Sequence, residues 1–132
     1  MSNLFLRHGE VENEKNVFYA NLPGFYLSNN GRTQAKNAGI KIKEQFDIKN
    51  IVSSPLLRAR QTAEIVNSVL KINITTSYNI IEWAGPSDWI GRTWDEIKLT
   101  QNFKNADGSP LNLINTGESL KSVFDRFNNI YE

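Results

Sequence analysis

Two short apolar stretches on either side of a long amphipathic segment restrict what this chain can fold into. "NIVSS" (residues 50–54) and "INITTS" (residues 72–77) both have the composition of short strands. Between them, "SPLLRARQTAEIVNSVL" repeats apolar residues at spacings of three and four, which predicts a helix with one buried face. Ser54 is expected to cap this helix, and Pro55 to occupy its first position. Strands that alternate with helices predict an α/β fold with a mostly parallel sheet flanked by helices.

The N-terminal third of the sequence continues the same alternation. Asn3 to Leu6 is predicted to be a short buried strand, followed by a polar loop to about Asn30. Arg32 to Phe46 carries apolar residues at helical spacing, with Ser28 as a start signal upstream. We therefore expect a strand, a long loop and a helix before the second strand.

The C-terminal third predicts two further helices. "TWDE" at residues 93–96 matches a capping box that opens a short helix, and a loop rich in Gly, Asp and Asn is expected from about 102 to 116. "GESLKSVFDRFNNIY" then places its apolar residues on one helical face; these are Leu120, Val123, Phe124, Phe127, Ile130 and Tyr131. At this length we expect one domain over residues 1–132.

Composition excludes several classes of function. The chain has 132 residues, with 15 Lys and Arg against 14 Asp and Glu, so its net charge of +1 provides no general attraction for nucleic acid. It contains no cysteine and one histidine, which excludes disulfides, a thiolate nucleophile and zinc sites built from Cys or several His. Neither a signal peptide nor a membrane-spanning segment is evident, so we expect a cytoplasmic protein with no membrane partner.

Charged and polar side chains gather where the first two strands end. Arg7 and His8 follow the first strand, whereas Ser53 and Ser54 end the second, with Arg58 one turn into the following helix. In parallel sheets ligands bind at these carboxyl ends, and a helix N-terminus and arginines favour a phosphate or a carboxylate. The competing interpretation is that the histidine is structural or exposed and that the arginines face water.

A neutral imidazole in such a site can attack phosphorus and form a phosphohistidine. The leaving oxygen then needs a proton from a carboxylic acid. Chemistry alone does not choose among the candidates for this acid, which are Glu10, Glu82, Asp88, Asp95 and Glu96.

Five motifs in order give the chain its resemblance to a known family. They are "LFLRHGE", "LPGFYLSNNGRTQA", "VSSPLLRARQTAEIV", "IIEWAGPSDWIGRTWDEI" and "TGESLKSVFDRF". This series resembles the histidine phosphatase superfamily, the group typified by cofactor-dependent phosphoglycerate mutase. The resemblance implies a phosphoglycerate mutase-like fold, with His8 as the phosphorylated nucleophile, Arg7 and Arg58 as phosphate-binding groups and Glu82 as proton donor. It implies no metal and no bound cofactor.

Other site residues match the family more loosely. The family often places an asparagine soon after its "RHGE", and here Asn13 and Asn16 both fit a substrate-binding role, together with Ser54. Trp83, Trp89 and Trp94 could line a substrate mouth, but tryptophans clustered in a loop region more often form a small satellite core.

The sequence departs from the family at its C-terminal end. Members continue past the "GES" helix into a strand with a second catalytic histidine, in a stretch resembling "VSHG", and this strand lies near the middle of the sheet. The chain has no second histidine, so we expect a C-terminally truncated domain. The missing strand would leave its neighbours unpaired and a helix face exposed, and both features promote association with another chain. We therefore expect a fragment of a longer protein or a homo-oligomer that covers the gap. A third possibility is a remodelled sheet in which the first two strands pair.

The resulting function hypotheses come from different classes. The first is a metal-independent phosphatase that hydrolyses a small phosphorylated metabolite through phospho-His8, and its close alternative is a mutase that transfers the phosphoryl group to a second hydroxyl. A non-catalytic module that binds a phosphorylated ligand or a protein is favoured by the missing histidine. An unrelated nucleotide-binding domain is disfavoured, because no Gly-rich phosphate loop follows a strand.

Overall fold

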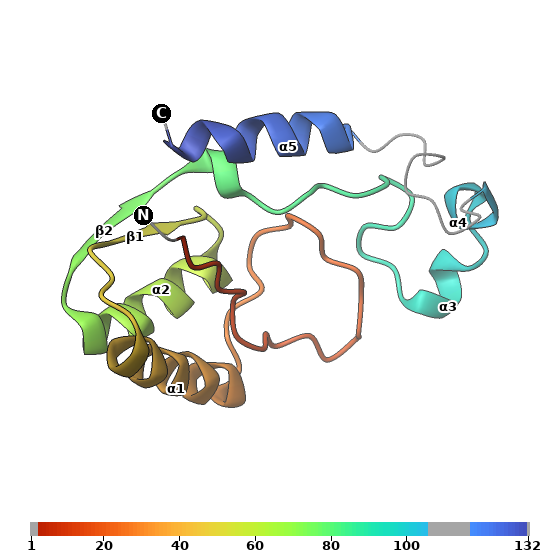
Figure 1. The fold of residues 1–132 in the computed structure, drawn as a ribbon. Helices are drawn as coiled ribbons and strands as arrows, with labels where there is room; N and C mark the ends of the chain where they lie inside the picture. Colours follow the sequence, from red (N-terminus) through yellow and green to blue (C-terminus); the bar gives the residue numbers. More distant parts are fainter. Residues whose placement is uncertain (1–2, 106–116, 132) are drawn as a thin grey trace. The chain divides into compact units, whose positions relative to one another are not determined.

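The computed structural model describes residues 3–105 and 117–131 and has an α/β fold (Figure 1). The chain divides into two compact units. The first unit contains residues 1–12 and 24–78, and the second contains residues 13–23 and 79–132. The expectation of one domain over residues 1–132 stays a prediction.

A strand, a helix and a strand form the centre of the first unit, as the sequence predicts. β1 (Asn50–Ser53) pairs in parallel with β2 (Asn73–Thr76), and Asn50 lies opposite Asn73 in the register. α2 (Leu57–Leu70) connects the two strands and packs against β1 and α1 (Asn29–Gln45) (Figure 1). The parallel pairing follows from this connection, because a helical crossover returns the chain to the edge where β1 began.

The two long helices approach each other closely at Gly39 of α1. A Cβ atom at this position would lie 3.2 Å from the Cα atom and the carbonyl oxygen of Val66 in α2. Ala35 and Ala63 are also small and buried, so the helix backbones can come together around a core completed by Leu27 and Val66. The packing of α1 on α2 fixes the two helix starts that lie near His8.

The predicted strand at Asn3 to Leu6 is wrong. Residues 3–10 have no regular secondary structure, and Leu4, Phe5 and Leu6 are 45%, 69% and 49% exposed. A strand needs a neighbour for its backbone hydrogen bonds, and within the described residues the one sheet consists of β1 and β2. The alternative in which the first two predicted strands pair is therefore wrong as well, whereas a second copy covering the sheet stays a prediction.

The predicted helix boundaries need correction at both long helices. Ser28 caps α1 through a hydrogen bond from the backbone N–H of Gly31, so the helix begins at Asn29, before Arg32, and Phe46 is its C-cap. α2 begins at Leu57 and not at Pro55, with no side-chain cap at Leu56. The expected cap, Ser54, instead accepts a long 3.4 Å hydrogen bond from the backbone N–H of Leu56 and stays in the turn.

The second unit contains short helices joined by irregular segments. They are η1 (Tyr78–Ile80, at the boundary between the units), α3 (Trp94–Ile97), α4 (Gln101–Asn105), α5 (Leu120–Asn128) and η3 (Asn129–Tyr131). Thr93 and Glu96 form the capping box of α3 that the sequence predicts. The loop expected at 102–116 is partly replaced by α4, and its remainder lies outside the described residues.

Two of the three tryptophans contact each other in the second unit. The ring of Trp89 lies 5.7 Å from Phe18 and 6.2 Å from Trp94, and its Nε1–H donates to Thr100 Oγ1 at 3.1 Å. Backbone hydrogen bonds between Phe18 and residues 91 and 92 join the loop to this cluster. The satellite-core interpretation therefore fits Trp89, whereas Trp94 is 56% exposed. Trp83 makes a separate contact described below.

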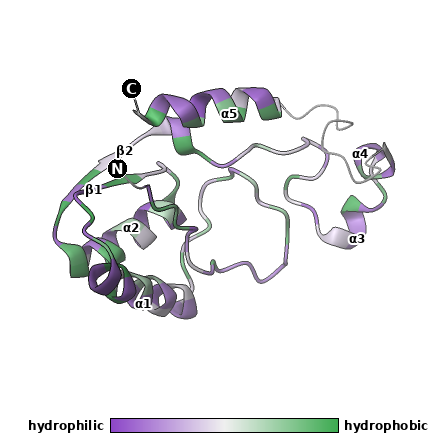
Figure 2. Cartoon of the chain, viewed as in Figure 1, coloured by the Kyte–Doolittle hydropathy of each residue, from purple (hydrophilic) through white to green (hydrophobic). Residues whose placement is uncertain are grey.

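The apolar face predicted for α5 exists in the sequence but is only partly covered. Hydrophobic and hydrophilic residues alternate along the helix (Figure 2). Leu120 and Phe124 are 39% and 67% exposed, whereas Val123, Phe127 and Ile130 are half-buried. The side chain of Tyr131, also assigned to this face, lies outside what the structure describes.

Candidate functional site

His8 is half-buried, and one of its ring nitrogens is already engaged. Nδ1 lies 2.7 Å from the carbonyl oxygen of Gly9. A carbonyl oxygen only accepts, so Nδ1 must carry the proton and donate. The neutral ring then keeps its lone pair on Nε2, which is the atom able to attack an electrophile.

The backbone after His8 forms hydrogen bonds with side chains of α1 and α2. The N–H of Gly9 donates to Thr62 Oγ1 at 3.1 Å, and the N–H of Glu10 donates to Gln34 Oε1 at 2.9 Å. A Cβ atom on Gly9 would overlap the carbonyl oxygen of Gly31, and one on Gly31 would overlap that of Glu10. The glycine of "RHG" is therefore required by a close backbone approach, and this approach holds His8 in place.

Thr62 links this segment to Arg58. Its hydroxyl donates to the backbone carbonyl of Arg58 at 2.8 Å while it accepts from the N–H of Gly9. Arg58 is 1% exposed and is the largest fully buried side chain among the described residues. A guanidinium that always carries its charge is costly to bury without partners. The phosphate-binding role of Arg58 stays a prediction.

Arg7 and Ser54 complete the predicted residues of the first unit. Arg7 is exposed, whereas Ser54 is buried at the end of β1. Arg7, His8, Ser54 and Arg58 all belong to the first unit, but Arg7 and His8 follow an irregular segment instead of the predicted strand. That these residues form one phosphate site stays a prediction.

The carboxylate of Glu10 binds residues at the start of α1. Its carboxylate accepts from Ser28 Oγ at 2.7 Å and from Asn30 Nδ2 at 3.2 Å. The hydrogen bond from Ser28, followed by that from Asn30, lowers the pKa of Glu10 below its ordinary value. A carboxyl group that is kept ionised in this way is a poor proton donor near neutral pH.

Two other candidate acids also have structural partners. Glu96 closes the capping box of α3, and the backbone and side-chain hydrogen bonds from Thr93 lower its pKa. Asp88 Oδ1 accepts from Asn102 Nδ2 at 2.8 Å. These contacts give Asp88 a structural role in a loop and Glu96 a structural role at a helix start.

The remaining predicted site residues, Asn13, Asn16 and Glu82, belong to the second unit. The side-chain amide of Asn13 donates to the carbonyl of Val17 and accepts from its N–H, so it closes the turn over residues 13–17. Asn16 is exposed and has a φ of 50° in that turn. Glu82 is exposed in an irregular segment. The substrate-binding roles of the two asparagines and the proton-donor role of Glu82 stay predictions.

Sequence reasoning missed the residues that support His8. Thr62 lies four residues after Arg58 on one face of α2, and Gln61 Oε1 accepts from the N–H of Leu27 at 2.8 Å. A polar residue on the buried face of a predicted helix was the available signal for Thr62. Gln34 and Gln61 gave no such signal, because glutamine is common on exposed helix surfaces.

Residues 3–105 and 117–131 contain no cluster of three or more His, Cys, Asp and Glu side chains that could hold a metal ion. No helix in these ranges is both long and apolar enough to cross a bilayer.

Comparison with known proteins gives a family match. The family model of the histidine phosphatase superfamily (branch 1) matches residues 4–132. A 2,3-bisphosphoglycerate-dependent phosphoglycerate mutase of Thermoplasma acidophilum is 34% identical over 80 residues, which are 60% of this chain and 40% of the mutase.

Solved structures share the fold. The structure described as Bacillus stearothermophilus YhfR has a TM-score of 0.76 at 28% identity and matches 95% of this chain and 62% of its own. A phosphoserine phosphatase of Entamoeba histolytica, solved with 3-phosphoglyceric acid, has a TM-score of 0.67 at 32% identity and matches 87% of this chain and 57% of its own.

The class defined by the fold is that of phosphoglycerate mutase-like α/β proteins. The chain belongs to the histidine phosphatase superfamily. It spans about half the length of the curated relatives it matches, between 40% and 52%.

Proposed function

We propose that the chain catalyses metal-independent phosphoryl transfer through a phosphohistidine at His8, with hydrolysis of a small phosphate monoester as the overall reaction. The observation that carries the proposal is the hydrogen bond from His8 Nδ1 to the carbonyl of Gly9 at 2.7 Å. It leaves the lone pair on Nε2 and fixes the ring in the tautomer that a nucleophile needs.

In the first step Nε2 of His8 attacks the phosphorus atom, and the ester P–O bond breaks. Arg7 and Arg58 neutralise the charge on the non-bridging oxygens. Glu82, in its protonated form, gives its proton to the departing alkoxide. The products of this step are an alcohol, phospho-His8 and the Glu82 carboxylate.

In the second step the Glu82 carboxylate takes a proton from water as the water oxygen attacks phosphorus. The P–N bond breaks, inorganic phosphate leaves, and the neutral imidazole and the carboxylic acid are restored. The sum is a hydrolysis in which both groups return to their starting protonation states. Asn13, Asn16 and Ser54 are proposed to contact the substrate.

The comparisons support phosphatase and mutase chemistry alike. The phosphoserine phosphatase neighbour favours hydrolysis, whereas the Thermoplasma relative favours isomerisation of a phosphorylated hydroxy acid. In the mutase alternative a second hydroxyl replaces water as the acceptor of the phosphoryl group. A requirement for 2,3-bisphosphoglycerate, measured with and without its addition, separates the two.

The test is to incubate the chain with a generic aryl phosphate and to measure released phosphate together with acid-labile phosphate on the protein. We expect a label that maps to His8 and that is absent from the His8→Ala variant. Neither label nor turnover in the unmodified chain would reject the enzyme function and leave the non-catalytic phospho-ligand module. Binding of inorganic phosphate by an unlabelled chain would support that module. A cytoplasmic location and homo-oligomerisation remain parts of the proposal that this test leaves aside.

A further inference from the structure

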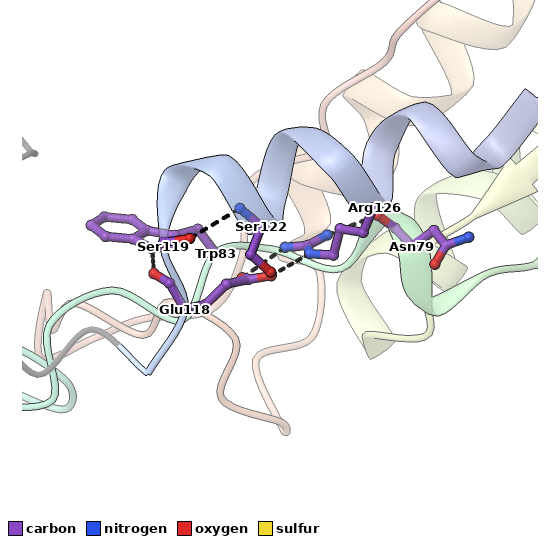
Figure 3. A network of polar contacts seen from close by, with 6 residues as sticks. All are labelled: Asn79, Trp83, Glu118, Ser119, Ser122 and Arg126. Atoms are coloured by element: carbon purple, nitrogen blue, oxygen red, sulfur yellow. Dashed lines mark hydrogen bonds and ion pairs between the residues drawn. The ribbon is translucent and has the colours of Figure 1, made fainter.

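The segment that carries Glu82 is held at both ends by residues around α5. Arg126 Nη1 donates to the carbonyl oxygen of Asn79 at 2.8 Å, and Trp83 Nε1 donates to the carbonyl oxygen of Glu118 at 3.2 Å (Figure 3). Apart from η1 the segment has no regular structure. These two side-chain contacts therefore fix the backbone on either side of Glu82.

Glu118 and Arg126 are joined by a two-point ion pair. Arg126 Nε lies 2.6 Å from Glu118 Oε1, and Nη2 lies 3.1 Å from Oε2. A planar guanidinium held at two points has a defined orientation, which directs its remaining Nη1 donor toward Asn79. The ion pair therefore orients the hydrogen bond from Arg126 to the carbonyl of Asn79. It also holds Glu118, whose backbone carbonyl accepts from Trp83.

The start of α5 anchors Glu118 in turn. Ser119 is the N-cap of the helix and accepts from the N–H of Ser122, whose hydroxyl lies 3.5 Å from Glu118 Oε1. The guanidinium of Arg126 also lies 5.2 Å from the ring centre of Phe127. Figure 3 shows Glu118 in contact with Trp83 and Arg126, Arg126 in contact with Asn79, and Ser119 in contact with Ser122.

This ion pair differs from the others found in the described ranges. The side chains of Glu118 and Arg126 are 20% and 15% exposed. In the pairs Lys49–Asp47, Lys98–Asp95 and Lys121–Asp125 every side chain is between 54% and 95% exposed. Covered, two-point pairs constrain geometry far more than exposed ones do, because water competes less for their hydrogen bonds.

We propose that Glu118 and Arg126 are positioning residues that hold Glu82 in the orientation needed for proton donation to the leaving group. This inference rests on the proposed function of Glu82. Neither residue touches the reacting atoms, and both act through the carbonyl of Asn79 and the indole of Trp83.

The proposal predicts an effect that depends on the leaving group. An alkyl phosphate expels a strongly basic alkoxide, which needs a proton from Glu82. A nitrophenyl phosphate expels a weakly basic phenolate, which leaves without one. A disturbed Glu82 should therefore slow attack on the alkyl ester and spare attack on the aryl ester, whereas general loss of structure should slow both.

The test compares kcat/KM for glycerol phosphate and for p-nitrophenyl phosphate in the unmodified chain and in Arg126→Met, with phospho-His8 measured in parallel. This constant reports the steps up to formation of phospho-His8 and leaves out its hydrolysis, which is the same for both esters. We expect the ratio of alkyl to aryl kcat/KM to fall about tenfold, since a misplaced general acid loses part of a contribution of roughly 10²–10⁴. Trp83→Phe keeps an aromatic ring but loses the N–H donor, so it provides a second, milder variant and should lower the ratio less.

Asp125→Asn is the matched control, because it breaks the exposed Lys121 pair on the same helix and leaves the Glu82 segment untouched. An unchanged ratio in both Arg126→Met and Trp83→Phe, with His8 labelled normally, would overturn the positioning role alone, as would an equal loss for the two esters. Absence of phospho-His8 in the unmodified chain would reject the proposed function and this inference together.

Discussion

The segment with His8 and the segment with Glu82 are built in different ways. Gly9 and Glu10 donate backbone hydrogen bonds to side chains of α1 and α2, two helices that pack on each other. The Glu82 segment is irregular, and a covered ion pair more than 30 residues further along the chain holds it. The expected nucleophile thus depends on backbone packing, whereas the expected proton donor depends on a few side chains.

The largest effect should come from Gly31→Ala in the first unit. The new Cβ would overlap the carbonyl oxygen and the amide of Glu10, both of which are backbone atoms that cannot rotate away. We expect a loss of roughly 3 kcal/mol in the free energy of unfolding, the upper end for overpacking, together with loss of phospho-His8. Urea titration followed by circular dichroism measures the first quantity.

Gly24→Ala is the control for that variant. Gly24 belongs to the same unit and has a φ of 88°, but a Cβ there meets no atom within 4 Å. Only backbone strain of about 1 kcal/mol is expected. Equal losses for the two variants would contradict the close approach of Gly31 to the backbone of Glu10 as the explanation for that glycine.

A second test removes the hydroxyl that joins the His8 segment to α2. Thr62→Val keeps the shape of the side chain but leaves the buried N–H of Gly9 without its acceptor. The expected cost is about 2 kcal/mol in stability, with a lower rate of His8 phosphorylation. Thr33→Val is the matched control, because Thr33 Oγ1 makes the same i−4 bond to Asn29 on an exposed surface. A cost for Thr62→Val no larger than that of the control would show that the hydroxyl does not support His8.

The same contrast explains how far the sequence predicts the fold and the site. Periodicity over 14 or more residues predicted α1 and α2, and the capping box at Thr93 predicted α3, because these signals are local. The strand expected at Asn3 to Leu6 failed because a strand depends on a partner elsewhere.

Some residues of the site are marked by local sequence motifs, and others only by tertiary contacts. His8 and Arg58 stood out through their motifs, and both lie in the first unit. Thr62, Glu118 and Arg126 act through hydrogen bonds to distant parts of the chain, which no local pattern records. Their roles could be recognised only once the tertiary contacts were known.

A third test uses pH to measure how much the Glu118–Arg126 ion pair contributes to stability. The hydrogen bond from Arg126 lowers the pKa of Glu118 below its ordinary value of 4.5. The positive charge of Arg126 also lowers this pKa, whereas partial burial raises it. Because the folded pKa lies below the unfolded one, the pair stabilises the fold above about pH 4.5. That stability is lost as the pH falls through the lowered folded pKa.

Glu118→Gln should therefore cost about 1 kcal/mol at pH 7, and the difference from the unmodified chain should shrink steadily on acidification below pH 4.5. Urea titrations at a series of pH values measure it. Asp125→Asn, which breaks an exposed pair, should remain within about 0.5 kcal/mol at every pH. A Glu118→Gln cost independent of pH would mean that shape, and not charge, joins α5 to the Glu82 segment.

The smallest effect is expected where the second unit relies on a local signal. Thr93 Oγ1 accepts from the N–H of Glu96, and Glu96 accepts in return from the N–H of Thr93. Thr93→Ala removes the first of these contacts and should cost about 1 kcal/mol. Asp95→Asn, in the same turn but bound only to Lys98 at 3.5 Å, is the control and should cost less. The fluorescence of Trp89 and Trp94 measures unfolding of the second unit. A stability cost for Thr93→Ala above that for Thr62→Val would contradict the view that the first unit depends more strongly on its backbone contacts.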